Sequence, residues 1–358
     1  MNTELTAEKT TQLKGQLTPS KIMQVGMGFW ASKALLSAVH FELFTLLGPG
    51  PLSAHDIQEK LSSKASIRHI YDWLDTLVSL GFLERKGLLD QAVYSNAEDT
   101  DFFLDMKKPG YMGGILEMAN NRLYKHWMNL DEALLTGQQQ NESKDDPHGN
   151  MDFFSKLYQD PGKLQEFMNA MSGIQTGNFI ALSNKFNFDN YSSLLDVGGA
   201  DGWLSIQVCL HHTDIQCTTF DLPPIEPLAK KKIESYGLKD RIQFMPGDFF
   251  KDELPKADII VMGNILHGMN EEGKLQLLDK VFKTLPDGGV FMTVENIIDN
   301  ERRQNTFGLL MSLNMLIENG DAFDYTLDDF KNWTSRAGFK RVELLPLSGP
   351  TSAAIAYK

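Results

Sequence analysis

Cysteine is scarce in this chain, and its scarcity excludes two kinds of site. Only two of the 358 residues are cysteines, Cys209 and Cys217. They fall in a predicted helix and a predicted strand, and their spacing matches neither a metal site nor a disulfide framework. We therefore expect two small core side chains, no metal centre and a reducing compartment.

Excess positive charge and long apolar runs are lacking as well. The formal net charge is -13, so the chain offers no basic face for nucleic acid. One basic run, at 230–232, lies in a predicted helix and is expected to be a solvated face. The polar first residues contain no signal-peptide core, and no stretch approaches the ~20 apolar residues of a membrane span. We expect a cytoplasmic protein whose partners include neither nucleic acid nor a membrane.

A complete dinucleotide fingerprint is also missing. Residues 193–221 read as a buried strand, a glycine-rich turn, a helix, a second strand and a terminal acid, which is the opening of a nucleotide-binding α/β domain. The motif G-x-G-x-x-G, starting at Gly198, requires glycines at positions 200 and 203. The chain has Ala200 and Trp203 there, so the pattern does not favour a dinucleotide.

The residues that are present in this turn favour another ligand. Asp196 lies at the end of the first strand, and Gly198 and Gly199 let the backbone turn tightly and approach a ligand. A carboxylate at this place repels a pyrophosphate but suits a cationic amine. Asp221, at the end of the second strand, can accept hydrogen bonds from both hydroxyls of a ribose. A ligand with a ribose, an adenine and an amino-acid tail, but no phosphate, is S-adenosylmethionine (SAM).

The periodicity of apolar residues divides the chain into three parts. The first contains helical patterns, a helix capped by Ser53 and a strand–turn–strand segment, which together make a winged-helix arrangement. Its longer helix carries Asp72 and Asp75, so a packing or dimer-forming role is favoured over DNA contact. We expect a mainly helical winged-helix dimerisation domain at 1–110, a helical linker with substrate-pocket helices at 111–185, and a catalytic domain at 186–358.

The catalytic part alternates strand and helix patterns, which predicts a mainly parallel sheet with helices on both faces. The fold class is therefore α/β, with a doubly wound Rossmann-like SAM-binding domain. In the helical part before it, the polar segment 138–150 is expected to be a surface loop. The strands are expected at 193–199, 215–221, 242–247, 257–264, 289–296, 339–346 and 352–357.

In such a sheet, ligands bind beyond the carboxyl ends of the strands. At the end of the third strand, Asp248 can accept from an adenine amino group and Phe249 can stack on the ring. Each strand end has a structural alternative, such as a tight turn, a solvated acid or a turn cap, but three in register favour a ligand. The residues expected at the cofactor are Asp196, Gly198, Gly199, Asp221, Leu222, Asp248, Phe249 and Asn264.

The fourth and fifth strands end in a possible base and its partner. His267 follows the fourth strand, and an imidazole with an unperturbed pKa of ~6.5 is the usual general base near neutral pH. Glu295 ends the fifth strand and is expected to hydrogen-bond one ring nitrogen of His267, which would fix its tautomer. A structural histidine and a solvated acid are the alternatives.

The order of motifs resembles one known family. DVGGADG, FDLPP, GDFF, NILHGMN, VEN and FDYTLDDFKNWTSRAGF follow one another along the chain. As a set they are similar to the SAM-dependent O-methyltransferases of the plant caffeate and animal acetylserotonin type, whose bacterial relatives act on phenolic natural products. The resemblance covers nearly the whole chain. It implies a homodimer, SAM as methyl donor, and metal-independent O-methylation of a small phenolic or polyketide-like acceptor in secondary metabolism.

The resemblance also assigns roles to residues. It implies that His267 is the base, that Glu295 is the first flanking acid, and that Asp324 takes the place of a second flanking Glu. Six further positions match the family's substrate pocket, although a helix core is an equal reading of their pattern. They are Phe167, Met171, Ile174, Met311, Asn314 and Met315.

The chain departs from the family pattern beside the base. The family's His-Asp-Trp is His267-Gly268-Met269 here, and Gly263 stands where a polar or cationic residue is common. These departures motivate one alternative, a SAM-binding relative with a non-methylating reaction, such as hydroxylation or a pericyclic step. The sequence also leaves open an N- or C-methyltransferase. A non-enzymatic regulator that uses the winged helix is a third alternative.

Overall fold

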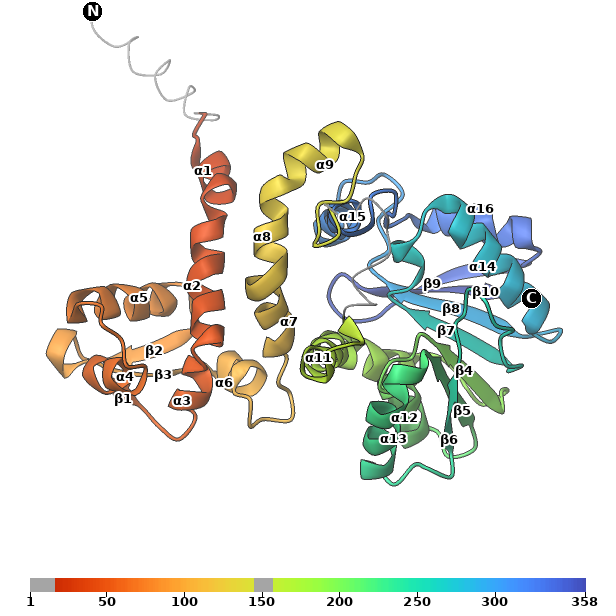
Figure 1. Ribbon diagram of the computed structural model, residues 1–358, viewed down its shortest axis with the longest axis horizontal. Helices are drawn as coiled ribbons and strands as arrows, with labels where there is room; N and C mark the ends of the chain where they lie inside the picture. The colour runs from red at the N-terminus through yellow and green to blue at the C-terminus, as the bar shows by residue number, and fades with distance from the viewer. Residues whose placement is uncertain (1–16, 145–156) are drawn as a thin grey trace, which may run out of the picture. The chain divides into compact units, whose positions relative to one another are not determined.

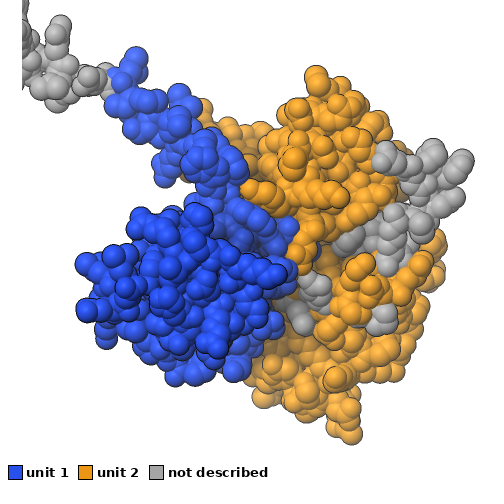
Figure 2. Space-filling model, turned by 60° about the vertical axis from the view of Figure 1, so that its left-hand side comes forward, with its two compact units in different colours: residues 1–120 blue, residues 121–358 orange. Residues whose placement is uncertain are grey.

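The computed structural model describes residues 17–144 and 157–358, and the chain divides into two units, residues 1–120 and 121–358 (Figures 1 and 2). The first unit packs helices around a small antiparallel sheet of order β1-β3-β2, which confirms the winged-helix prediction. Its core is formed by apolar residues such as Phe44, Leu74 and Tyr94, each almost fully buried. Its elements are α1 (Ser20–Gly26), α2 (Gly28–His40), α3 (Leu43–Leu47), β1 (Leu52–Ser53), α4 (Ala54–Lys60), α5 (Ile67–Ser79), β2 (Leu83–Lys86), a 3-10 turn (Leu89–Gln91), β3 (Val93–Asn96), α6 (Glu98–Leu104) and α7 (Gly113–Met118).

The predicted cap of α4 is present as a full capping box. The Ser53 hydroxyl accepts a hydrogen bond from the Asp56 amide, and the Asp56 carboxylate accepts from the Ser53 amide. The two side chains therefore satisfy backbone donors that a helix start otherwise leaves open. Asp75 of α5 pairs with Arg85 of β2 and accepts from Tyr94 of β3, so this acid joins the helix to the wing.

The first two helices correct one expectation. Residues Ser20–His40 form a helical stretch of 21 residues that is long and apolar enough to cross a membrane, whereas no such stretch was expected. Only 17% of its most apolar window is buried. Large side chains such as Ile22, Val25 and Trp30 are more than half exposed. The core helix of a soluble protein and a signal sequence pass the same test, so length and composition alone do not identify a membrane span.

The second unit begins with a helix that changes its winding. A π-helical turn (Ala119–Leu123) leads into α8 (Tyr124–His126), a 3-10 turn (Trp127–Asn129) and α9 (Leu130–Thr136). After the residues that are not described, α11 (Pro161–Lys185) starts with the Asp160 carboxylate capping two backbone amides. The described parts of the segment predicted as helical are therefore mostly helical, but in pieces, and the predicted helical residues 151–156 lie outside the described residues.

A seven-stranded sheet forms the centre of this unit, in the order β6-β5-β4-β7-β8-β10-β9 (Figure 1). The first five strands are parallel, and β10 is antiparallel to both β8 and β9. All seven predicted strands exist within a few residues of their expected bounds. The strands are β4 (Ser193–Val197), β5 (Gln216–Asp221), β6 (Ile242–Pro246), β7 (Ile259–Gly263), β8 (Val290–Glu295), β9 (Arg341–Pro346) and β10 (Ser352–Tyr357).

Helices cover both faces of the sheet. Alternate residues of β4 point to opposite faces, with Leu194 packed in the core that contains α11, α12 and α13, and Leu195 in the core that contains α14 and α16. This is the doubly wound arrangement that the alternating pattern predicted. The remaining elements are α12 (Trp203–His211), α13 (Glu226–Ser235), α14 (Glu271–Thr284), α15 (Thr306–Asn319), α16 (Leu327–Ala337), and 3-10 turns at Pro223–Ile225 and Leu266–Gly268.

The two cysteines behave as predicted. Cys209 of α12 and Cys217 of β5 are free and almost fully buried, with their sulfur atoms 3.5 Å apart.

Candidate active site

The candidate site lies where the strand order reverses, at the carboxyl ends of β4 and β7. Two residues other than glycine have a left-handed backbone there, Ala200 with φ 50° and Asn264 with φ 54°. This conformation costs roughly 1–2 kcal/mol in an L-residue and tends to persist at functional sites. Ala200 stands at the position where the dinucleotide motif has glycine, so the turn keeps a glycine-like backbone without a glycine.

The glycine turn is required by close packing. A Cβ on Gly198 would lie 2.4 Å from the Ile265 side chain, and one on Gly199 would lie 2.6 Å from the carboxyl carbon of Asp196. Asp196 is buried beneath this turn, where the Ser205 hydroxyl donates to it. Burial raises the pKa of Asp196 to about 7. Its enclosed carboxyl helps to hold the turn, and its contact with the cofactor amine stays a prediction.

Asp221 joins the turn to the end of β5. Its carboxylate accepts from the amides of Ala200 at 2.8 Å and Leu222 at 2.7 Å. Burial raises the pKa of Asp221 to about 6, although these two hydrogen bonds act in the opposite direction. The side chain is only partly covered, so its remaining lone pairs can accept from a ribose diol.

Asp248 and Phe249 lie at the end of β6. The Asp248 carboxylate accepts from the Phe250 amide and pairs with Lys251 at 2.8 Å, and this network keeps its pKa low. Phe249 lies 3.9 Å from the Cβ that Gly198 would carry. The aromatic ring therefore reaches the glycine turn, as adenine stacking requires. Together with Asp221, this apolar and acidic edge fits SAM.

The imidazole of His267 faces Asp324. Its Nδ1 lies 3.4 Å from Oδ1 of Asp324, and both side chains are buried. His267 is held by the short 3-10 turn after β7, and Asp324 by the loop between α15 and α16. The Asp324 amide donates to the Ser312 hydroxyl of α15. If Nδ1 carries the proton toward Asp324, the other ring nitrogen, Nε2, is left as the acceptor.

Glu295 has a different partner from the one expected. Its Oε1 accepts from the backbone amides of Ile265 at 2.9 Å and His267 at 3.3 Å. Glu295 thus holds the backbone of the segment that carries the imidazole, and Asp324 faces the ring itself. The sequence had predicted a hydrogen bond between Glu295 and a ring nitrogen of His267, and this contact is replaced by the one to Asp324.

Charge balance shifts the proton affinity of this cluster. Burial alone would lower the pKa of His267, but the carboxylates of Asp324 and Glu295 outweigh it and raise the pKa above its ordinary value. Burial raises the pKa of Glu295. The imidazole is therefore a stronger proton acceptor than a free histidine.

The expected substrate-pocket residues lie on two helices. Phe167, Met171 and Ile174 of α11 are half-buried, and Phe167 packs against the core beside the sheet. On α15, Met311 is half-buried, while Asn314 and Met315 are almost fully buried. The oxygen of the Asn314 amide is already engaged, because it accepts from the Trp127 indole at 2.9 Å.

The segment expected to be a surface loop anchors α15 instead. Gln140, Asn141 and Ser143 are buried. The Gln140 amide donates to the Ile317 carbonyl, and the Asn141 side chain donates to the carbonyl of Glu318. These polar residues serve the open carbonyls at the helix end, which a pattern of hydrophobicity cannot reveal. Residues 145–150 of the predicted loop lie outside the described residues.

Arg122 completes this anchor. Its guanidinium binds both oxygens of Glu142 and both oxygens of Glu318, at 2.6–2.8 Å. Bidentate pairs of this kind fix geometry as well as charge.

Two lysines were missed or misread from the sequence. Lys232 is not only solvated, because its ammonium pairs with Asp201 at 2.6 Å and lies over the Trp203 ring. Lys274 of α14 is fully buried near His267. Its signal was its place on the apolar face of its helix, in register with Leu277, Leu278 and Val281.

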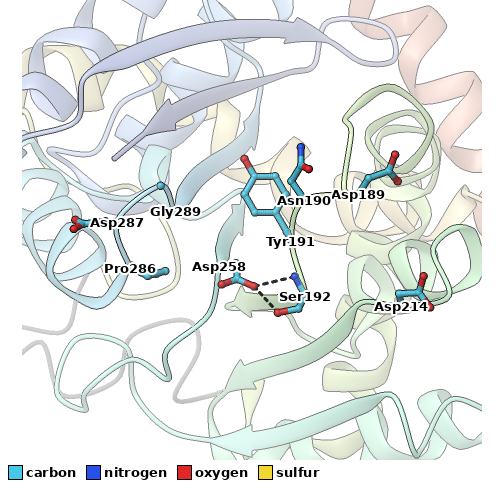
Figure 3. Close-up of a pocket in the computed structure, with 10 residues that line it drawn as sticks. Asp189, Asn190, Tyr191, Ser192, Asp214, Asp258, Pro286, Asp287 and Gly289 are labelled. Atoms are coloured by element: carbon cyan, nitrogen blue, oxygen red, sulfur yellow. Dashed lines mark hydrogen bonds between the residues drawn. The ribbon is translucent and has the colours of Figure 1, made fainter.

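A separate hollow of about 500 Å³ lies at the opposite, amino-terminal edge of the sheet (Figure 3). Asp258 lies in it and accepts from the amide and hydroxyl of Ser192. Since the carboxyl ends carry the predicted ligand residues, this hollow is not the candidate site.

Comparison with known proteins adds to this geometry. The O-methyltransferase domain model matches residues 127–340, and the O-methyltransferase dimerisation domain model matches residues 23–105. The tetracenomycin polyketide synthesis 8-O-methyl transferase TcmO of Streptomyces glaucescens is 36% identical over 340 residues, 95% of this chain and 97% of the relative. The N,N-dimethyltransferase OxyT of Streptomyces rimosus is 30% identical, over 92% of this chain and 93% of the relative. The human N-acetylserotonin methyltransferase structure in complex with SAM superposes with a TM-score of 0.86 at 26% identity, covering 97% of this chain and 99% of that one.

Proposed function

Because the chain belongs to the SAM-dependent O-methyltransferase family, we propose that it methylates a hydroxyl of a small aromatic, polyketide-like acceptor, with His267 as general base and without a metal. The family, the SAM cofactor and the methyltransferase class, each predicted from the sequence, are confirmed by the matches. The acceptor, the base and the absence of a metal are our proposal.

The His267–Asp324 pair carries this proposal. With Nδ1 of His267 facing the buried carboxylate at 3.4 Å, Nε2 can take the proton of an acceptor hydroxyl. Asp324 then stabilises the imidazolium that forms, and Glu295 holds the backbone of the same segment. The elevated pKa of His267 narrows the gap to a phenol of pKa ~10. A general base of this kind contributes typically 10²–10⁴-fold in rate. In this proposal His267 activates the acceptor hydroxyl, and no metal ion takes part.

The cofactor would be held by the residues at the carboxyl ends of the strands. Asp221 would accept from the ribose, Phe249 would contact the adenine, and the Gly198–Gly199 turn would allow close approach of the backbone. Leu222, Asp248 and Asn264 complete the expected contacts. When bound, SAM supplies the electrophilic methyl group.

The acceptor class rests on the relatives and on the helices near the site. TcmO takes its name from tetracenomycin polyketide synthesis, and it shares almost the full length of this chain. Met171, Met311 and Met315, with Phe167 and Ile174, offer thioether, aromatic and aliphatic surface that suits a flat aromatic molecule.

Nitrogen methylation is a second candidate, because OxyT is named as an N,N-dimethyltransferase. An aromatic amine needs less help from a base than a hydroxyl does. Loss of His267 should therefore reduce O-methylation far more than N-methylation.

We also propose a homodimer in the cytoplasm. The dimerisation domain match begins at residue 23 and covers most of the exposed apolar side chains of α1 and α2, which would be buried by a second copy. A monomer at micromolar concentration in analytical ultracentrifugation would contradict the dimer.

The decisive experiment compares wild type with His267→Ala. We expect kcat for a phenolic acceptor to fall by about 10²–10⁴-fold. The SAM Kd from calorimetry should stay within about twofold, since the cofactor residues are untouched. Retained activity in the variant would refute the base assignment.

A further inference from the structure

Lys274 is a buried cation for which the proposed chemistry has no direct use. It lies on α14 (Glu271–Thr284), and its side chain is fully buried. Taking an ammonium out of water is unfavourable unless partners compensate for the lost hydration. Among the described residues no carboxylate lies within ion-pair distance of it. Packing alone therefore does not explain a lysine at a position that an apolar side chain could fill.

The ammonium contacts both segments that carry the His267–Asp324 pair. It donates a hydrogen bond to the carbonyl of Met269, two residues after the histidine. It also lies over the ring of Phe323, 3.6 Å from the ring centre, one residue before the aspartate. These two segments are far apart in the chain, so the distance between them in space depends on contacts such as those of Lys274.

Two further rings complete the environment of this cation. The ammonium lies 6.0 Å from the ring centre of Tyr325 and 5.6 Å from that of Trp333. Tyr325 directly follows Asp324 and donates to Thr293 of β8, so it is fixed to the sheet. Aromatic faces attract a desolvated ammonium through the negative face of the ring. Lys274 is thus tied to residues on both sides of Asp324.

We propose that Lys274 is a positioning residue that joins the His267 segment to the Asp324 segment and sets the electrostatic balance of the pair. The inference rests on the proposed function, because it assumes that His267 is the base. The charged groups that face the imidazole are Asp324, Glu295 and Lys274. Those that act on the ammonium are Glu295, Asp324, Asp321 and Glu271.

The sign of the electrostatic effect follows from these groups. The two carboxylates favour the protonated imidazole, and the ammonium opposes them. Burial lowers the pKa of Lys274 to about 8, so the ammonium is mostly charged at neutral pH. Without it, the carboxylates act unopposed, and the pKa of His267 rises further.

The test is the pH profile of kcat/KM for Lys274→Met, which keeps the length of the side chain but removes its charge and donors. We expect kcat to fall by about tenfold or more, because the His267 and Asp324 segments would shift and misplace the reacting groups. The affinity for SAM should stay within about twofold of wild type. The acidic limb should move to higher pH. A packing role alone would lower the melting temperature without moving that limb.

Lys283→Met is the matched control, because Lys283 lies on the same helix but is exposed and pairs with Asp279 at the surface. It should leave both kcat and the limb unchanged. Lys274→Gln keeps one donor for Met269 without the charge, so it should move the limb in the same direction with a smaller loss of kcat. It also carries the test if the Met variant does not fold.

Wild-type protein provides a readout that needs no substitution. Reductive methylation of the native protein, followed by mass spectrometry, should modify Lys283 and spare Lys274. Equal modification would overturn the buried contact. If His267→Ala is inactive but Lys274→Met keeps the wild-type kcat and limb, only this inference fails. If His267→Ala remains active, the proposed base fails first.

Discussion

Replacing Asp324 by Asn tests the most specific feature of the site. The structure places this carboxylate, and not Glu295, against Nδ1 of His267, at 3.4 Å. Asn has the same shape and can still accept from Nδ1, but it has no charge. The substitution therefore removes the electrostatic stabilisation of the imidazolium and leaves the geometry in place.

The size of the effect follows from the geometry. Loss of the carboxylate from a catalytic Asp–His pair can cost about 10⁴-fold in kcat. The separation here is longer than the 2.7–2.9 Å of a strong charge-assisted hydrogen bond. We therefore expect a loss of about 10²-fold, or ~2.7 kcal/mol of transition-state stabilisation. Neither carboxylate oxygen has a hydrogen-bond partner among the described residues, so the variant should fold.

The pH dependence gives the sign. In wild type, Asp324 helps to raise the pKa of His267, so activity falls as pH drops through that elevated pKa. In Asp324→Asn the pKa should fall, and the acidic limb of kcat/KM should move to lower pH. This direction is opposite to that expected for Lys274→Met.

The assay is initial-rate methylation between acidic and alkaline pH, with Asp328→Asn as the control. Asp328 is an exposed acid on α16, so its loss should leave the profile unchanged. An Asp324→Asn variant with wild-type kcat and an unmoved limb would refute the pairing of Asp324 with the base. If Glu295→Gln moves the acidic limb and Asp324→Asn does not, Glu295 is the acid that acts on the imidazole, as the sequence predicted.

Three further results are expected. Asp221→Ala should weaken SAM binding by about 10- to 100-fold in calorimetry, because a charged hydrogen bond contributes about 1.5–3 kcal/mol; unchanged affinity would remove Asp221 from the site. Ala200→Gly should leave the free energy of unfolding unchanged or raise it by up to about 1 kcal/mol in a urea titration, because relief of the left-handed strain exceeds the entropy cost of glycine; a loss above about 1 kcal/mol would contradict the strain. Full activity should persist after dialysis against a chelator, and loss that is restored by a divalent metal would refute metal independence.

The strands could be predicted closely because each buried parallel strand is a short apolar run followed by a polar or glycine-rich end. The helix cap at Ser53 could be predicted as well, because the capping residue and its helix are neighbours in the sequence. The insertion of β10 between β8 and β9 was not predictable. Two neighbouring apolar strands at the end of a chain can pair with the sheet in either order.

Contacts between distant segments account for the differences at the site. The sequence pointed to His267, Glu295 and Asp324, but only the structure shows which acid faces the ring. The buried loop at Gln140 and the Trp127–Asn314 contact also join residues far apart in the chain. Propensity and spacing describe neighbours along one element, so they do not report such pairs.

O-methylation itself can be measured by transfer of a ¹³C-labelled methyl group from SAM to a panel of hydroxylated aromatic acceptors, followed by NMR of the product. We expect a new O-methyl signal, one S-adenosylhomocysteine formed for each product, and loss of both with His267→Ala. A labelled methyl on nitrogen or carbon, or a changed acceptor without any labelled methyl, would contradict it.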